Sequence, residues 1–290
     1  MVWKGFGGWD GPDQPDNDHY RGGLRPDQLA FVANYLHTVP REDLVVLAMH
    51  IPLEKGASPQ VVEQPELMRL LSSHPKTLSI SGHSHRQAHS FLGAAEGYAP
   101  EGGGEHHHLN LGAASGSWYR GPLDANGLPD ATMRDGTPPG FSLLRFEGTS
   151  YSARYRVARR DVDYQMNIAV PFELPQADVE GTEVVVNVFA GSVRSEVRMR
   201  LGASEWIPLD RVRRFDPLYV MARKGHKQLG ATPWRELPPP TRSTPLWAGV
   251  LPGGVPPGPH RLEVESTDVF GQVHRGFQPI LVLPAEDDAP

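Results

Sequence analysis

The chain has 290 residues and contains no cysteine. Disulfide bonds, thiolate nucleophiles and cysteine-ligated zinc or iron–sulfur centres are therefore excluded. No apolar run approaches the roughly 18 residues that a membrane-spanning helix needs. The first residues lack a charged segment followed by an apolar core, so no secretory signal peptide is visible. The sequence is compatible with a cytoplasmic protein and with one that is exported from a longer precursor.

The chain also lacks a large excess of positive or negative charge. Charged residues make up 21% of the chain, and the formal net charge is -6. Nucleic acid is not expected as the main partner, because such proteins usually carry an excess of lysine and arginine. In contrast, 31 glycines and 29 prolines favour turns and short strands over long helices. The length favours two domains.

Two apolar runs end in histidine. Leu44–Met49 leads into His50, and Thr77–Ile80 leads through Ser81 into Gly82-His83-Ser84-His85. In α/β sheets, ligands and catalytic groups collect at the carboxyl ends of the strands. Neutral imidazole suits zinc, iron, nickel or manganese. The glycine permits a sharp turn, so the two histidines after it can face two different metals.

The first half of the chain predicts a layered α/β domain. An apolar repeat from Leu29 to Val39 predicts a helix that Pro26 opens, and Pro65 to Ser73 predicts a second helix. These helices alternate with the two histidine-ending strands. Residues 5–23, rich in glycine and aspartate, predict an exposed loop.

A histidine tract follows at His106–His108. Such tracts can bind metals, but neighbouring residues on a strand face opposite ways, so at most His106 and His108 share a face. An ordinary strand with polar exposure is the preferred interpretation. Further along, 141–146 and 151–157 predict a β-hairpin that turns at Glu147-Gly148.

Beyond about residue 165 the pattern predicts only strands, which favours an antiparallel β-sandwich. The expected domains are 1–163 and 164–290. The expected strands are Glu183–Val188, Ser195–Leu201, Trp206–Leu209, Leu218–Ala222, Arg261–Ser266 and Val273–Leu283.

With these motifs, the chain resembles the calcineurin-like metallophosphoesterase superfamily, in particular a bacterial branch with an extra C-terminal β-domain. His50 in Met49-His50-Ile51-Pro52 resembles the penultimate metal-binding motif of that superfamily, and Gly82-His83-Ser84-His85 resembles its final Gly-His-x-His motif. The resemblance covers nearly the whole chain. It implies an α/β metallophosphoesterase core followed by the β-sandwich.

The resemblance also implies hydrolysis of a phosphate mono- or diester by two divalent metal ions, manganese, iron or zinc. His50 and His83 match ligands of one metal, and His85 matches a ligand of the other. Plausible substrate-wall residues are Tyr20, Arg21, Trp118, Tyr119 and Arg120.

The sequence departs from the superfamily in one respect. The Asp-x-His, Gly-Asp-x-x-Asp and Asn-His motifs, which normally precede the two present here, do not occur before His50. The chain therefore resembles a C-terminal portion, with a separately encoded N-terminal half as one conceivable partner. The three histidines are expected to hold one metal at best, and phosphoesterase activity is expected to be impaired.

Two other functions stay open. The β-sandwich could belong to a non-catalytic protein that recognises envelope polysaccharide or a protein partner. Alternatively, His50, His83 and His85 with a water molecule would form a mononuclear metal site. The histidines could also be ordinary core or surface residues, although both strand ends carry them.

Overall fold

The computed structural model describes residues 2–5, 20–53, 61–230 and 232–284. The chain divides into two compact units. The first comprises residues 1–84, 89–111 and 144–152, and the second comprises 85–88, 112–143 and 153–290. The predicted domain boundary between 163 and 164 stays a prediction. None of the helices in the described ranges is long and apolar enough to cross a membrane.

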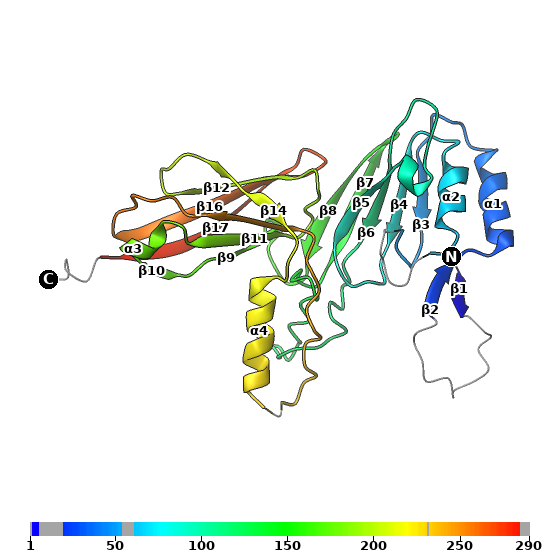
Figure 1. The fold of residues 1–290 in the computed structure, drawn as a ribbon. Helices are drawn as coiled ribbons and strands as arrows, with labels where there is room; N and C mark the ends of the chain where they lie inside the picture. Colours follow the sequence, from blue (N-terminus) through cyan, green and yellow to red (C-terminus); the bar gives the residue numbers. More distant parts are fainter. Residues whose placement is uncertain (1, 6–19, 54–60, 231, 285–290) are drawn as a thin grey trace. The chain divides into compact units, whose positions relative to one another are not determined.

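The first unit contains a four-stranded sheet in the order β3-β4-β6-β5 (Figure 1). Neighbouring strands β3, β4 and β6 are parallel. The bounds are β3 Val45–Ala48, β4 Thr77–Ser81, β5 Ala88–Leu92 and β6 His106–Asn110, with a short 3-10 helix at Ala94–Glu96.

Two helices pack against this sheet, α1 (Pro26–Leu36) and α2 (Gln64–Leu71). Their apolar faces share one buried cluster with the sheet, in which Leu36, Leu67 and Val45 each contribute a side chain. The burial of these faces explains why the 3.6-residue repeat forms helices here. Both predicted helices and both predicted strands are confirmed to within two or three residues at their ends.

The N-terminal segment differs from the predicted loop. Strand β1 (Val2–Gly5) pairs antiparallel with β2 (Tyr20–Gly23), so the prediction of a loop over 5–23 is wrong at its two ends. The backbone amide of Val62 donates to the Gly22 carbonyl, which joins β2 to the start of α2. Residues 6–19, with Asp10 and Asp13, lie outside the described residues.

The predicted hairpin is confirmed as β7 (Gly140–Glu147) and β8 (Ser150–Val157). Gly148 adopts a φ of +59° in the turn, a conformation that glycine accepts without steric cost.

The second unit contains a sandwich of two sheets, as the sequence predicts. One sheet has the order β10-β17-β16-β12-β13 and the other β14-β15-β11-β9. Their inner faces share one apolar core, in which Val186, Met199, Val264 and Trp247 are almost completely buried. The bounds are β9 Met166–Ala169, β10 Glu173–Pro175, β11 Glu183–Val188, β12 Glu196–Leu201, β13 Ile207–Pro208, β14 Asp210–Val212, β15 Leu246–Val250, β16 Gly258–Thr267 and β17 Val273–Leu283.

This part of the chain is not all β. Helix α4 spans Pro217–Gln228, so the predicted strand Leu218–Ala222 is wrong, and a short helix α3 spans Gln176–Val179. Asp216 caps α4 by accepting a hydrogen bond from the Tyr219 amide at 2.7 Å. An aspartate followed by proline is a helix-start pattern, and the apolar alternation over five residues concealed it.

Candidate metal centre

The parallel pairing of β3 and β4 brings two of the predicted ligands to the same sheet edge. Ala48 lies opposite Ile80 in the ladder, and the Met49 amide donates to the Ile80 carbonyl at 2.9 Å. The Gly82 amide then donates to the His50 carbonyl at 3.2 Å. The two strand ends therefore stay hydrogen-bonded up to the residues that carry the histidines.

The side chains of His50 and His83 are in direct contact. Nε2 of His50 and Nδ1 of His83 lie 2.9 Å apart, and the ring centroids are 4.8 Å apart with the planes nearly perpendicular. His83 adopts a φ of +68°, which is uncommon for a residue with a β-carbon. A residue held in this region frequently belongs to a functional site.

This contact is a hydrogen bond in which one imidazole donates and the other accepts. With metal–nitrogen distances of about 2.0–2.1 Å, two ligand nitrogens at a right angle are separated by about 2.9 Å. The two nitrogen atoms are therefore as far apart as two such ligands would be. No group of three His, Cys, Asp or Glu side chains placed to hold a metal occurs in the described ranges. Among the described residues, this edge therefore brings two histidines together.

The third predicted ligand, His85, belongs to the second unit. Its Nδ1–H donates a hydrogen bond to the Gly116 carbonyl, and its ring stacks on Trp118 with centroids 4.2 Å apart. A backbone carbonyl on Nδ1 fixes the tautomer that presents the Nε2 lone pair, which is how metal-binding histidines are commonly oriented. His85 also has a left-handed backbone, with a φ of +48°.

Three of the five predicted substrate-wall residues lie in one turn beside His85. Trp118 and Tyr119 both have left-handed backbones and exposed side chains. The Arg120 guanidinium lies 5.9 Å from the centre of the Trp118 ring, and its buried Nε makes no hydrogen bond among the described residues. Tyr20 and Arg21 have described backbones in β2, but their side chains lie outside the described part.

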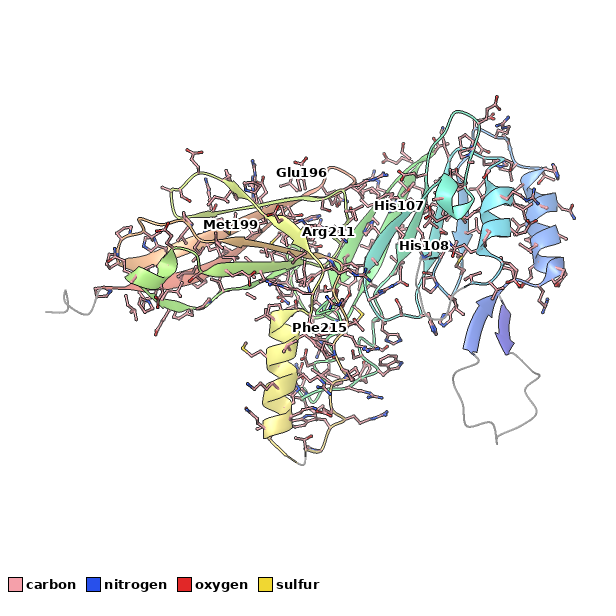
Figure 2. All side chains as sticks on the ribbon, viewed as in Figure 1. His107, His108, Glu196, Met199, Arg211 and Phe215 are labelled. Atoms are coloured by element: carbon pink, nitrogen blue, oxygen red, sulfur yellow. The ribbon has the colours of Figure 1, made fainter. Side chains whose placement is uncertain are left out.

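The histidine tract is buried, so the prediction of polar exposure is wrong. Figure 2 labels two of its residues, His107 and His108, on β6. His106 and His108 share a face, as the strand period requires, and Ser79 Oγ lies 2.6 Å from His106 Nε2 and 2.7 Å from His108 Nδ1. On the opposite face, His107 stacks on Phe91 at 4.6 Å. The sequence did not reveal this burial, because the polar side chains that form hydrogen bonds with these rings lie on neighbouring strands, far away in the sequence.

The direction of these hydrogen bonds follows from one backbone donor. The Leu53 amide donates to His108 Nε2 at 3.1 Å, so the ring proton of His108 is on Nδ1 and donates to Ser79. The Ser79 hydroxyl then donates to His106 Nε2, whose Nδ1–H donates to Thr77 Oγ1 at 2.8 Å. Both rings are neutral. Burial lowers the pKa of His106 to about 4, and burial together with the neighbouring histidines lowers the pKa of His108 to about 3.

The same row of side chains reaches the Gly-His-x-His segment. Ser81 Oγ lies 3.0 Å from His108 Nε2 and 3.2 Å from Asn110 Oδ1, and Asn110 Nδ2 donates to Ser84 Oγ at 2.6 Å. Ser84 lies between His83 and His85 in the sequence. The buried network between β4 and β6 therefore fixes the loop that carries the final motif.

A second buried network surrounds Asp135, in a turn where the Gly136 amide donates to the Met133 carbonyl. Its carboxylate accepts hydrogen bonds from the Gln87 amide at 3.1 Å and the Thr137 amide at 3.0 Å. Complete burial raises the pKa of this carboxyl despite those donors. Asn187 Nδ2 donates to the Asp135 carbonyl and to the Asp216 carboxylate, which ties the turn to α4.

Comparison with known families gives a match over the second part of the chain. Residues 107–274, more than half of the chain, match the family described as the C terminal of calcineurin-like phosphoesterase. The chain therefore belongs to the calcineurin-like phosphoesterases, and the matched residues include the turn with Trp118 and the sandwich strands up to the start of β17. The histidines at positions 50, 83 and 85 precede the matched range. No curated protein matches the chain.

Proposed function

We propose that this chain is a metal-dependent phosphoesterase that acts on a phosphate mono- or diester. The observation that carries the proposal is the contact between His50 and His83 at the carboxyl ends of β3 and β4. Membership of the calcineurin-like phosphoesterases supports it. The α/β sheet of the first unit would be the part of the catalytic core that presents these ligands.

His50 and His83 would hold one divalent metal, manganese, iron or zinc, and His85 would serve a second metal. A bound metal of this kind polarises a phosphate oxygen and lowers the pKa of a bound water. The chain's own contribution is to orient its imidazoles. The Gly116 carbonyl directs His85, and the Asn110 amide holds Ser84 beside the other ligand.

The wall of the substrate site would include Trp118, Tyr119 and Arg120, together with Tyr20 and Arg21. A guanidinium such as that of Arg120 suits a phosphate oxygen, because charge-assisted hydrogen bonds to phosphate are strong. Because the described residues bring only two imidazoles into contact at this edge, we expect the chain by itself to bind one metal weakly and to hydrolyse its phosphate ester slowly.

Manganese titration of the purified chain by calorimetry tests the metal site. His50→Ala and His83→Ala should each weaken manganese binding by at least about 100-fold, since loss of even an indirect supporting partner costs 10–100-fold. His37→Ala is the matched control, because that exposed histidine lies at the end of α1. Equal manganese affinity in all three variants and the wild type would contradict the proposal.

Hydrolysis of bis(4-nitrophenyl) phosphate and of 4-nitrophenyl phosphate with manganese tests the activity. Slow metal-dependent turnover that His85→Ala removes is the expected result. Fast turnover that is abolished by the same substitution would show an intact centre and overturn the expectation of impaired activity. Metal analysis separates a dinuclear from a mononuclear centre.

A further inference from the structure

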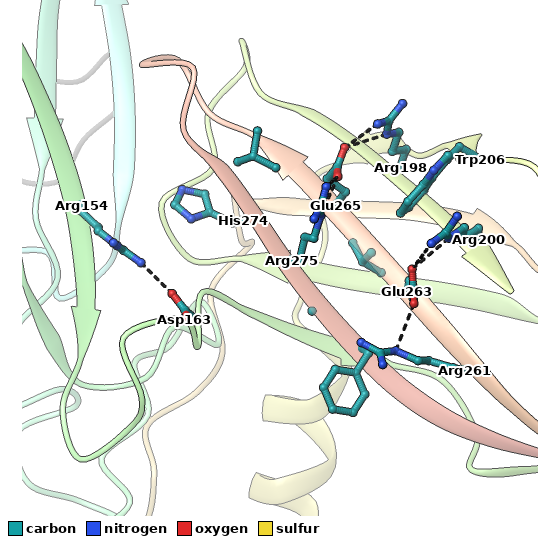
Figure 3. A pocket seen from close by; sticks show the side chains of 14 residues that line it. Arg154, Asp163, Arg198, Arg200, Trp206, Arg261, Glu263, Glu265, His274 and Arg275 are labelled. Carbon is teal, nitrogen blue, oxygen red and sulfur yellow. Dashed lines mark hydrogen bonds and ion pairs between the residues drawn. The ribbon is translucent and has the colours of Figure 1, made fainter. Parts of the chain in front are cut away.

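The outer face of the sheet β10-β17-β16-β12-β13 carries a groove of about 880 Å³ (Figure 3). Alternation along the strands separates this face from the sandwich core. On β12, for example, Met199 points inward and is buried, whereas Arg198 and Arg200 lie on the groove side. The groove is thus built from strand residues whose positions the sheet fixes.

A first cluster of charges crosses three strands. Arg198, Glu265 and Arg275 are directly opposite one another in the register of β12, β16 and β17. Arg198 donates from Nε and Nη2 to Glu265 Oε1 at 3.0 and 2.5 Å. Arg275 approaches Oε2 of the same carboxylate from the other side at 2.9 and 2.8 Å. We call these three residues the first triad.

A second triad lies next to it along β16. Arg200 donates from Nε and Nη2 to Glu263 Oε2 at 2.9 and 2.7 Å, and Arg261 Nε lies 3.2 Å from Glu263 Oε1. Each carboxylate is therefore shared by two arginines (Figure 3). The arginines lower the pKa of both glutamates, so the glutamates stay ionised and each triad keeps one excess positive charge.

The groove contrasts with the rest of the molecule in charge. Five arginines line it against three carboxylates, although the whole chain has a net charge of -6. In the part of the chain that the structure describes, Arg198, Arg200 and Arg275 bind their glutamates through Nε and Nη2, and Nη1 of each makes no hydrogen bond. These donors are available to an anion from outside.

Aromatic rings hold the guanidinium groups in place. The guanidinium carbons of Arg198 and Arg200 lie 4.8 and 4.7 Å from the centre of the Trp206 ring. That of Arg261 lies 4.3 Å from the centre of the Phe277 ring. Guanidinium groups fixed by both a carboxylate and a ring lose little conformational freedom when they bind a ligand, which favours affinity.

Stability alone does not account for this arrangement. Exposed ion pairs contribute little to stability, and the Arg275 and Arg261 side chains are 77% and 61% exposed. One arginine per glutamate would already provide such a pair. The second arginine in each triad adds uncompensated charge, which costs stability unless an anion neutralises it.

The spacing of the triads indicates the kind of anion. Glu263 and Glu265 are two residues apart on β16, so the triads repeat at about 7 Å. Charges recur at a comparable spacing in an extended phosphodiester chain, and further apart in a polysaccharide with one acidic group per disaccharide. We propose that this groove binds a phosphodiester-linked polymer, with successive phosphates against the two triads. This inference does not depend on the phosphoesterase activity.

Fluorescence anisotropy on the full chain tests the proposal, with labelled oligothymidylate and labelled poly(glycerol phosphate) as probes over a series of salt concentrations. Arg261→Gln combined with Arg275→Gln removes one arginine from each triad. The slope of log K against log salt should fall in magnitude by about 1.4, since each phosphate contact on a single strand contributes about 0.7. Binding of one probe rather than the other identifies the polymer.

The matched control is Arg41→Gln combined with Arg69→Gln. It removes the same net charge from two exposed arginines of the first unit, each paired with one glutamate. Its slope should equal that of the wild type. Glu263→Gln should tighten binding several-fold at low salt, because it removes a neutralising carboxylate from the second triad.

Three results would overturn the proposal. The first is an equal change of slope in both double variants, which would indicate attraction by overall charge. The second is no binding of either probe at about 50 mM salt, where phosphate contacts are strong. The third is preferential binding of hyaluronate, which carries one carboxylate per disaccharide and would assign the groove to an acidic polysaccharide.

Discussion

At the scale of single residues, backbone conformation marks the candidate site. His83, His85, Trp118 and Tyr119 all have positive φ values between 48° and 68°. Each such residue costs roughly 1–2 kcal/mol, so the surrounding structure must enforce the conformation. The Gly-His-x-His pattern indicated that the histidines matter. It did not indicate the strained turn at Trp118, because strain has no signature in residue type.

Gly116 offers a test of how tightly this turn is built. It has a φ of +51°, and a β-carbon there would lie 1.8 Å from the Ala131 carbonyl oxygen. That carbonyl already accepts a hydrogen bond from the Ser117 amide, so it is not free to move. Gly116→Ala should therefore lower the free energy of unfolding by at least about 3 kcal/mol, measured by urea denaturation.

Gly103→Ala is the control for backbone strain alone. Gly103 has a φ of +78°, but no atom of the described residues lies within 4 Å of the place that a β-carbon would take. Its substitution should cost about 1 kcal/mol. Equal losses in the two variants would show that the Ala131 carbonyl does not confine the turn.

At the scale of elements, the sequence predicted helices and strands well where one apolar face is buried. The periodicity that defined α1 and β17 is a direct consequence of packing on one side. The pattern failed at α4, whose start depends on Asp216 rather than on an apolar stripe. It also failed at His106–His108, where the strand is buried on both faces although its residues are polar.

The β4–β6 pair should make the protein sensitive to mild acid. His106 and His108 have pKa values of about 4 and about 3 in the fold, against about 6.5 when unfolded. Below pH 6.5 the unfolded chain binds more protons, so stability falls as pH falls. Each histidine should lower the free energy of unfolding by about 1.4 kcal/mol per pH unit down to about pH 4.

Urea denaturation between pH 7 and 4.5 measures this dependence. Replacing both histidines by glutamine keeps neutral hydrogen-bonding groups but removes the titration. The double variant should therefore show a flatter dependence on pH over that window, whatever its stability at pH 7. A wild-type profile that the double variant reproduces would contradict the assignment of the acid sensitivity to these two rings.

At the scale of the whole molecule, the chain has two separate large cores. One contains Leu36, Leu67 and Leu71 beside the four-stranded sheet, and the other fills the sandwich around Met199 and Trp247. The two clusters have no residue in common. Two transitions are therefore expected in a calorimetric scan.

Substitutions in the two cores should act on different transitions. Leu71→Ala and Met199→Ala each truncate a side chain with no exposed surface, and each should cost about 2–5 kcal/mol. We expect Leu71→Ala to lower the transition temperature of the core beside the four-stranded sheet, and Met199→Ala to lower that of the sandwich core. A single transition that both substitutions lower equally would show that the chain unfolds as one cooperative unit.

The sequence by itself determined which elements alternate in the first half, the β-sandwich, and the strand ends that carry His50 and His83. These depend on local periodicity and on short motifs, which sequence displays directly. Tertiary structure alone decided the rest. The contact between His50 and His83, the buried network of the histidine tract and the paired triads of the groove each join residues far apart in the chain. Only strand register brings such residues together, and register depends on the packing of whole sheets.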